Sequence, residues 1–149
     1  MLFNILLWVH ILVVVIAFGA NLTYILWFFR SENSRESLLF TLRTVKMMDD
    51  RMANPSYVLA FFTGAGMIYV DGLSYLTPWI LTALILYAIV SVLGLAIYSP
   101  WLKKQIALAE KPDSAEYKAI ANRVNTLGLV LNLLVLTITF LMVVKPQLW

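Results

Sequence analysis

The residue with the most evident chemical capacity in this sequence is its one histidine. His10 lies within an uncharged, apolar stretch of residues 3–29. A neutral imidazole nitrogen can be an axial ligand to a haem iron or a chlorophyll magnesium, and it can also hydrogen-bond to a neighbouring helix. Because an imidazole in lipid needs protein, water or a cofactor as its partner, the sequence leaves both uses open.

Two further residues are candidates for the same site. Asn21 follows His10 by eleven positions, and at about 100° per residue it returns to within roughly 20° of the same helical face. Gly64 belongs to a small-residue patch at residues 63–66, where a helix backbone or a flat macrocycle can approach closely. We therefore predict His10, Asn21 and Gly64 as cofactor-binding residues. His10 would be the metal ligand, and haem b and a chlorophyll-type pigment are the candidate cofactors.

Small and amide residues also predict where helices pack. In residues 118–144, Asn125, Gly128 and Asn132 recur at steps of three and four, and such a polar stripe must meet another helix in the membrane. Gly66 offers a close helix contact in the same way. The sequence predicts no catalytic residue, since it has no cysteine and no serine with an identifiable base. A non-enzymatic role is favoured.

The composition predicts an integral membrane protein. Hydrophobic residues make up 62% of the 149 positions and charged residues only 13%, against about 25% charged residues in soluble proteins. Hydropathy and length indicate an all-α, single-domain bundle of four transmembrane helices. The expected spans cover about residues 3–29, 55–71, 78–99 and 118–144. Proline marks their limits: Asn54 with Pro55 reads as a helix start, and Pro100 as the end of the third span.

The charged connections predict the topology. Apolar residues in the segment 30–54 recur at steps of three and four, which indicates a cytoplasmic amphipathic helix between the first two spans. They are Leu38, Leu42, Val45, Met48 and Met52. Lysine and arginine concentrate in segments 30–54 and 100–123 and are absent from 72–77, so the positive-inside rule places both termini outside. Lipid contact and topology account for these basic residues, which argues against nucleic-acid binding. We expect a multi-pass protein of the bacterial cytoplasmic (inner) membrane.

Four groups of residues resemble a superfamily of small bacterial membrane proteins. They are His10 with Phe18, Gly19 and Tyr24; Arg51 with Pro55 and Thr63-Gly64; Trp79; and Arg123 and Asn125 with the closing Met142 to Pro146. Together they resemble the four-helix fold shared by an uncharacterised family of predicted integral membrane proteins, the J-type membrane protoporphyrinogen oxidase (HemJ) and the copper-resistance protein CopD.

The resemblance implies a haem-ligand role for His10, because the matching histidine of the oxidase branch binds haem b. That branch also carries a lysine four residues after the tryptophan of its third span, and a further histidine. Here Ala83 stands four residues after Trp79, and the third span has no histidine, so the oxidase activity is not expected.

We therefore predict a non-catalytic accessory or scaffold subunit of a larger respiratory or photosynthetic membrane complex. Its partners would be the lipid bilayer and other membrane subunits or further copies of the chain. The alternative is a b-type haem- or pigment-binding redox membrane protein related to HemJ, with His10 as axial ligand.

Overall fold

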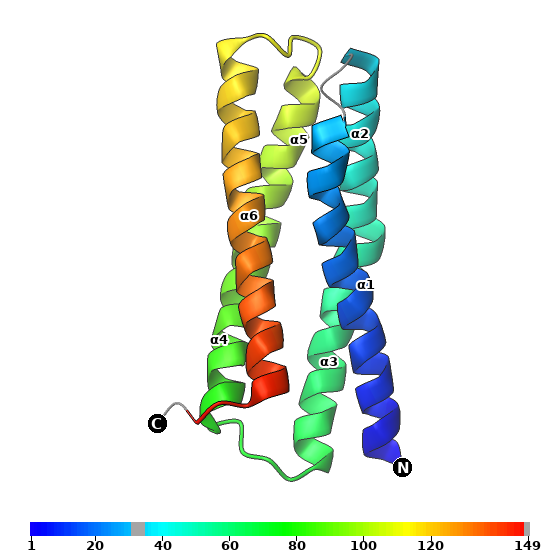
Figure 1. The fold of residues 1–149 in the computed structure, drawn as a ribbon, viewed down its shortest axis with the longest axis vertical. Helices are drawn as coiled ribbons and strands as arrows, with labels where there is room; N and C mark the ends of the chain where they lie inside the picture. Colours follow the sequence, from blue (N-terminus) through cyan, green and yellow to red (C-terminus); the bar gives the residue numbers. More distant parts are fainter. Residues whose placement is uncertain (31–34, 148–149) are drawn as a thin grey trace.

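The computed structural model describes residues 1–30 and 35–147, which are helical apart from short turns (Figure 1). The first helix is α1 (Leu2–Arg30). The second consists of α2 (Arg35–Met48), the π-helical turn η2 (Asp49–Ala53) and α3 (Asn54–Val70). The third consists of α4 (Pro78–Val92), the π-helical turn η3 (Leu93–Tyr98) and α5 (Ser99–Leu108). The fourth is α6 (Ala115–Val144).

The four long helices form two antiparallel hairpins. α1 packs along α2, η2 and α3, while α6 packs along α4, η3 and α5. The hairpins meet where α2 contacts α5 and where α1 contacts α6. Figure 1 shows both termini and the α3–α4 turn at one end of the molecule, and the α5–α6 connection at the other.

Three helices are long and apolar enough to cross a membrane, namely Leu2–Phe28, Pro78–Leu108 and Ala115–Val144. At 1.5 Å per residue the shortest of them extends about 40 Å, more than the roughly 30 Å of a hydrocarbon core. α3 has 17 residues and extends only about 25 Å. The all-helical membrane architecture is therefore confirmed, and the span expected at residues 55–71 stays a prediction.

The two prolines expected at helix boundaries lie inside helices, so these predicted boundaries were wrong. Asn54 is itself helical and its backbone N–H donates to Asp49 O, five residues back, immediately before Pro55. Likewise Ser99 N–H donates to Gly94 O immediately before Pro100, and the helix continues to Leu108. Proline lacks an N–H and its ring crowds the preceding turn, and both π-turns end just before a proline. The wider π-turn accommodates the ring without ending the helix.

The predicted amphipathic segment is helical but is not a separate interfacial helix. α2 continues through η2 into α3 and packs against α1 and α5, although its Phe40 and Met47 are exposed. Leu42 and Val45 are fully buried together with Leu102 of α5 and Val124 of α6. We call these four residues the apolar core; Ile80 of α4, in the other half of the bundle, is also fully buried.

Candidate functional site

His10 is hydrogen-bonded across the first hairpin. Its Nδ1 lies 2.9 Å from Thr63 Oγ1 of α3, and that hydroxyl lies 2.7 Å from the carbonyl oxygen of Leu59. A hydroxyl has one proton, which Thr63 donates to Leu59 O, so Thr63 Oγ1 accepts from His10 Nδ1–H. This arrangement leaves the lone pair of the imidazole on Nε2.

The small-residue patch lies against α1. A Cβ on Gly64 would come within 3.3 Å of His10 Cε1, and one on Gly66 within 3.4 Å of Leu6 Cδ1. The missing side chains therefore let α1 approach α3 closely. The structure thus brings His10 and Gly64 together. Asn21 does not join them: its Nδ2 donates to Tyr57 Oη at 2.6 Å, because eleven residues correspond to about 16 Å along a helix.

The predicted polar stripe of α6 is only partly packed. Asn132 Nδ2 donates to Gly128 O of the same helix at 3.0 Å, and a Cβ on Gly128 would lie 3.5 Å from Tyr98 Cε2 of η3. Asn125 is exposed. The buried face of α6 includes Val124 and Leu131, and Asn125 lies beside it, so its predicted packing role stays a prediction.

A cavity of about 120 Å³ lies between the hairpins, and sequence reasoning did not predict it. Its surface is mainly apolar, and we call it the polar cavity for the polar side chains in its lining. Every long helix contributes to its lining, and both π-turns do so. The polar lining side chains are Asn21 and Tyr24 of α1, Asp49 of η2, Asn54 and Tyr57 of α3, Tyr87 and Ser91 of α4, Tyr98 of η3 and Asn132 of α6.

Some of these polar groups satisfy one another, and two do not. Tyr57 Oη accepts from Asn21, and Tyr87 Oη donates to the backbone oxygen of Tyr57 at 3.1 Å. Tyr24 Oη and Asn132 Oδ1 are buried without a hydrogen-bond partner among the described residues. Tyr24 is only 5% exposed. Since buried polar atoms are normally hydrogen-bonded, these two atoms provide a donor and acceptors for a molecule in the cavity.

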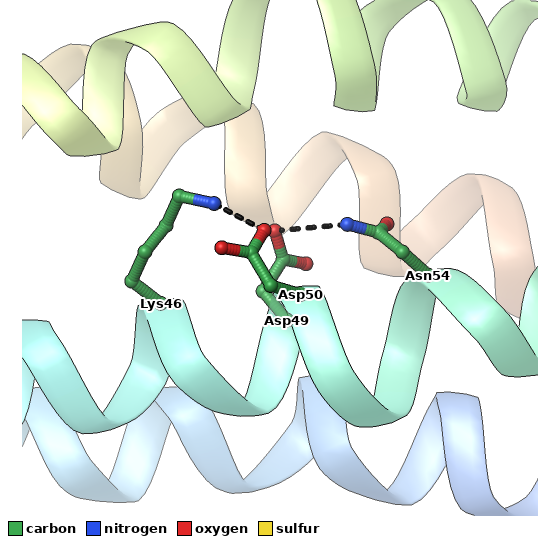
Figure 2. A network of polar contacts seen from close by, with 4 residues as sticks. All are labelled: Lys46, Asp49, Asp50 and Asn54. Carbon is green, nitrogen blue, oxygen red and sulfur yellow. Dashed lines mark hydrogen bonds and ion pairs between the residues drawn. The ribbon is translucent and has the colours of Figure 1, made fainter.

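Asp49 is the acidic group of the cavity, and its neighbour Asp50 is not part of the lining. Lys46 forms an ion pair with Asp50, while Asn54 Nδ2 donates to Asp49 Oδ2 at 3.5 Å (Figure 2). The Asp49 side chain is buried in η2, outside the three helices that can cross a membrane. Burial raises the pKa of Asp49 to about 6; Lys46 and Asn54 oppose this shift and Asp50 adds to it. Asp49 therefore titrates close to neutral pH.

The Asp49 carboxylate also interacts electrostatically with tyrosines of three other segments, Tyr24, Tyr57 and Tyr98. The signal for this site in the sequence was a set of tyrosines and amides within or beside apolar segments. To find the site from the sequence, one would need to know which residues of different helices lie at the same level along the bundle axis.

The family comparison agrees with the membrane architecture. No curated protein and no solved structure matches the chain, and the relation to HemJ and CopD stays a prediction. Residues 4–146 match the profile of a family described as predicted integral membrane protein (DUF2269). Since this match covers nearly the whole sequence, the chain belongs to the DUF2269 family of integral membrane proteins.

Proposed function

We propose that this integral membrane protein is a non-catalytic accessory subunit that binds a small molecule in the polar cavity between its hairpins. The observation that carries the proposal is a pair of buried atoms, Tyr24 Oη and Asn132 Oδ1, that have no hydrogen-bond partner in the described part of the chain. They come from opposite hairpins and line the same cavity. A bound molecule would supply the hydrogen bonds whose absence is costly for buried groups.

The cavity chemistry favours binding over reaction. Ser91 is the serine of the lining. Its Oγ donates to Tyr87 O of the same helix at 2.9 Å, so this hydroxyl has a structural role and not that of a nucleophile. A cavity of about 120 Å³ compares with an engineered cavity of about 150 Å³ that holds benzene. The ligand would therefore have roughly six to eight non-hydrogen atoms.

Two glycines offer a matched pair of variants for testing the cavity. A Cβ on Gly94, which lines the cavity, meets no atom within 4 Å, and the same is true of Gly19, which does not line it. Gly94→Leu would therefore fill the cavity, while Gly19→Leu adds the same side chain elsewhere.

The experiment measures binding to the detergent-purified protein by thermal unfolding and native mass spectrometry. The probes are three molecules of similar shape and different charge: choline, 3,3-dimethylbutan-1-ol and 3,3-dimethylbutanoate. We expect at least one to bind the wild type and Gly19→Leu but not Gly94→Leu. If none binds the wild type, or if Gly94→Leu binds equally well, the proposal is wrong.

We further propose that the subunit works beside other subunits, or other copies of itself, in the bacterial inner membrane. In support, each of the three spans has at most 17% of its most apolar window buried inside the chain, so most of its surface is available for lipid or protein. Mild solubilisation followed by native mass measurement tests this. A stable monomer without a partner would contradict it.

The proposed orientation has both termini and the α3–α4 turn outside. In support, ten of the eleven lysines and arginines precede residue 124, in segments 30–54 and 100–123, and Lys145 is the exception. The chain has no cysteine, so single cysteines report accessibility cleanly. An impermeant maleimide should label Ser74→Cys in intact cells and Glu36→Cys only after permeabilisation, and the reverse pattern would refute the orientation.

Haem or pigment ligation by His10 is the second candidate function. It is favoured by the Nδ1 contact with Thr63, because ligating histidines usually donate their other ring N–H to a neighbour. Each chain would supply one axial ligand, and a second copy could supply another. A purified protein without a Soret or chlorophyll band, or with one that His10→Ala leaves unchanged, excludes this use.

A further inference from the structure

We infer that the ligand of the polar cavity is a small organic cation of the ammonium type, held by the Asp49 carboxylate and the surrounding tyrosines. This inference rests on the proposed function, because it names the chemical class of the molecule that the cavity binds. Three properties of the lining carry it: charge, aromatic content and hydrogen bonding.

The charge of the lining is negative. Among the described residues that line the cavity, Asp49 is the one acidic side chain and none is a lysine, arginine or histidine. The nearby Lys46 is ion-paired with Asp50 (Figure 2). A buried carboxylate is costly unless a cation or several hydrogen bonds compensate it, and the hydrogen bond that Asp49 accepts from Asn54 is long at 3.5 Å. A cationic ligand would add to the partial compensation from Lys46, whereas an anionic ligand would be repelled.

The aromatic content favours an organic cation over a metal ion. Tyr24, Tyr57, Tyr87 and Tyr98 come from four different segments and surround one cavity. Aromatic rings attract ammonium groups through their quadrupole, and cages of such rings recognise quaternary ammonium ligands. A hard metal ion instead requires about six oxygen ligands, and the described residues contain no cluster of three metal-ligating side chains.

The unpartnered atoms suit a cation that also carries a donor. Asn132 Oδ1 can accept from an N–H or a hydroxyl of the ligand, and Tyr24 Oη can donate to a ligand oxygen or to Asp49. Choline combines a quaternary ammonium group with one hydroxyl and has seven non-hydrogen atoms, within the size range that the cavity suggests. It is therefore the probe of choice.

The test compares choline with its uncharged isostere 3,3-dimethylbutan-1-ol, using the whole protein in a neutral detergent and isothermal titration calorimetry. We expect choline to bind the wild type about tenfold or more tightly than the alcohol, the factor expected from one favourable charge contact. Asp49→Asn should reduce this ratio to about two or less, because it removes the charge that choline contacts and the alcohol does not use. Asp50→Asn removes a carboxylate outside the lining and is the control; it should keep a clearly larger ratio than Asp49→Asn.

The outcomes separate this inference from the proposed function. If the alcohol or 3,3-dimethylbutanoate binds as well as choline, the cation inference is overturned and the cavity remains a binding site. If no probe binds, both fail. Should Asp49→Asn not fold, the wild type itself provides the test. Its affinity for choline should fall as the pH drops through 6, while its affinity for the alcohol stays constant, and a choline affinity independent of pH would overturn the inference.

Discussion

The two halves of the bundle differ in how their helices pack. One half contains α2 and α5, and the other contains α3 and α4, although α2 and α3 belong to one long helix and α4 and α5 to another. In the first half apolar side chains meet directly, and Leu42, Val45 and Leu102 are completely buried. In the second half large aromatic side chains join α3 to α4: the rings of Phe61 and Tyr87 are stacked with their centroids 5.6 Å apart. The polar cavity adjoins this aromatic contact, since Tyr87 also lines it.

The difference shows how a small membrane protein can keep polar groups inside without losing its fold. The first half provides tight packing, which holds the hairpins together. The cavity region contains the buried Asp49 and the Tyr24 hydroxyl, which has no hydrogen-bond partner among the described residues. The first half holds one such atom, Gln105 Oε1. Both π-turns contribute lining residues, Asp49 from η2 and Tyr98 from η3. We interpret the change in helical winding at these π-turns as the reason why the two side chains point toward the cavity.

The largest expected effect comes from truncating a side chain of the apolar core. Leu102→Ala should lower the free energy of unfolding by about 2–5 kcal/mol, because it removes a completely buried side chain and leaves a cavity. Equilibrium unfolding in detergent measures the change. The control is Val92→Ala on the same long helix, where the side chain is 62% exposed and the expected loss is within about 0.5 kcal/mol. Equal losses in the two variants would show that the α2–α5 half is not the stabilising half.

Removing the charge of the buried Asp49 carboxylate should raise the free energy of unfolding. Asp49→Asn should stabilise the ligand-free protein at pH 7 by up to about 3 kcal/mol, since the pKa of Asp49 is raised from 3.8 to about 6 in the folded state. The folded state therefore holds the proton more tightly than the unfolded state, and wild-type stability falls as the pH rises from about 4 to 6. The variant should lack this fall.

The pH dependence depends on the groups around Asp49. These are Lys46, Asp50 and Tyr57 on its own long helix, and Tyr24 and Tyr98 on the helices packed against it. Unfolding curves recorded between pH 4 and 8 for wild type, Asp49→Asn and Asp50→Asn provide the measurement. Asp50→Asn should keep a smaller fall in stability, because Asp50 contributes to the raised pKa of Asp49 while burial remains its largest cause. A wild-type stability that rises over this range would contradict the assignment.

The sequence allowed the helical membrane architecture to be predicted, because long uncharged stretches carry that information locally. It did not reveal the continuity of the helices through Pro55 and Pro100, because a polar residue followed by proline looks the same at a helix start and after a π-turn. Packing in the bundle, which local sequence does not encode, decides between the two. His10 and Gly64 were predicted to belong to one site, but their direct contact was not predicted. The hydrogen bond between His10 and Thr63 was not predicted either.

The cavity could not be predicted for a related reason. Its lining residues are separated by up to about a hundred positions, as Asn21 and Asn132 illustrate. Periodicity within one helix identifies a polar face but not the face that it meets. Asn132 was thus correctly singled out as polar within a span, but its role was assigned to helix packing, while its Oδ1 lies buried at the cavity without a partner.

The smallest expected effect concerns how α1 contacts α3 in the polar half. Gly64→Ala places a Cβ within 3.3 Å of His10 Cε1, so the imidazole must shift by a few tenths of an ångström and its bond to Thr63 weakens. Removing a helical glycine by itself gains roughly 0.5–1 kcal/mol, which Gly19→Ala should show because its Cβ meets no neighbour within 4 Å. We therefore expect Gly64→Ala to be less stable than Gly19→Ala by about 1 kcal/mol, an amount typical of one weakened hydrogen bond. Unfolding in detergent gives the difference, and the imidazole ¹⁵N shifts of His10 report whether its hydrogen bond has changed. Equal gains in stability for the two variants, with unchanged ¹⁵N shifts of His10, would contradict this expectation. The contact between His10 and Gly64 would then not hold α1 against α3, and the packing of the two halves would differ less than their side chains indicate.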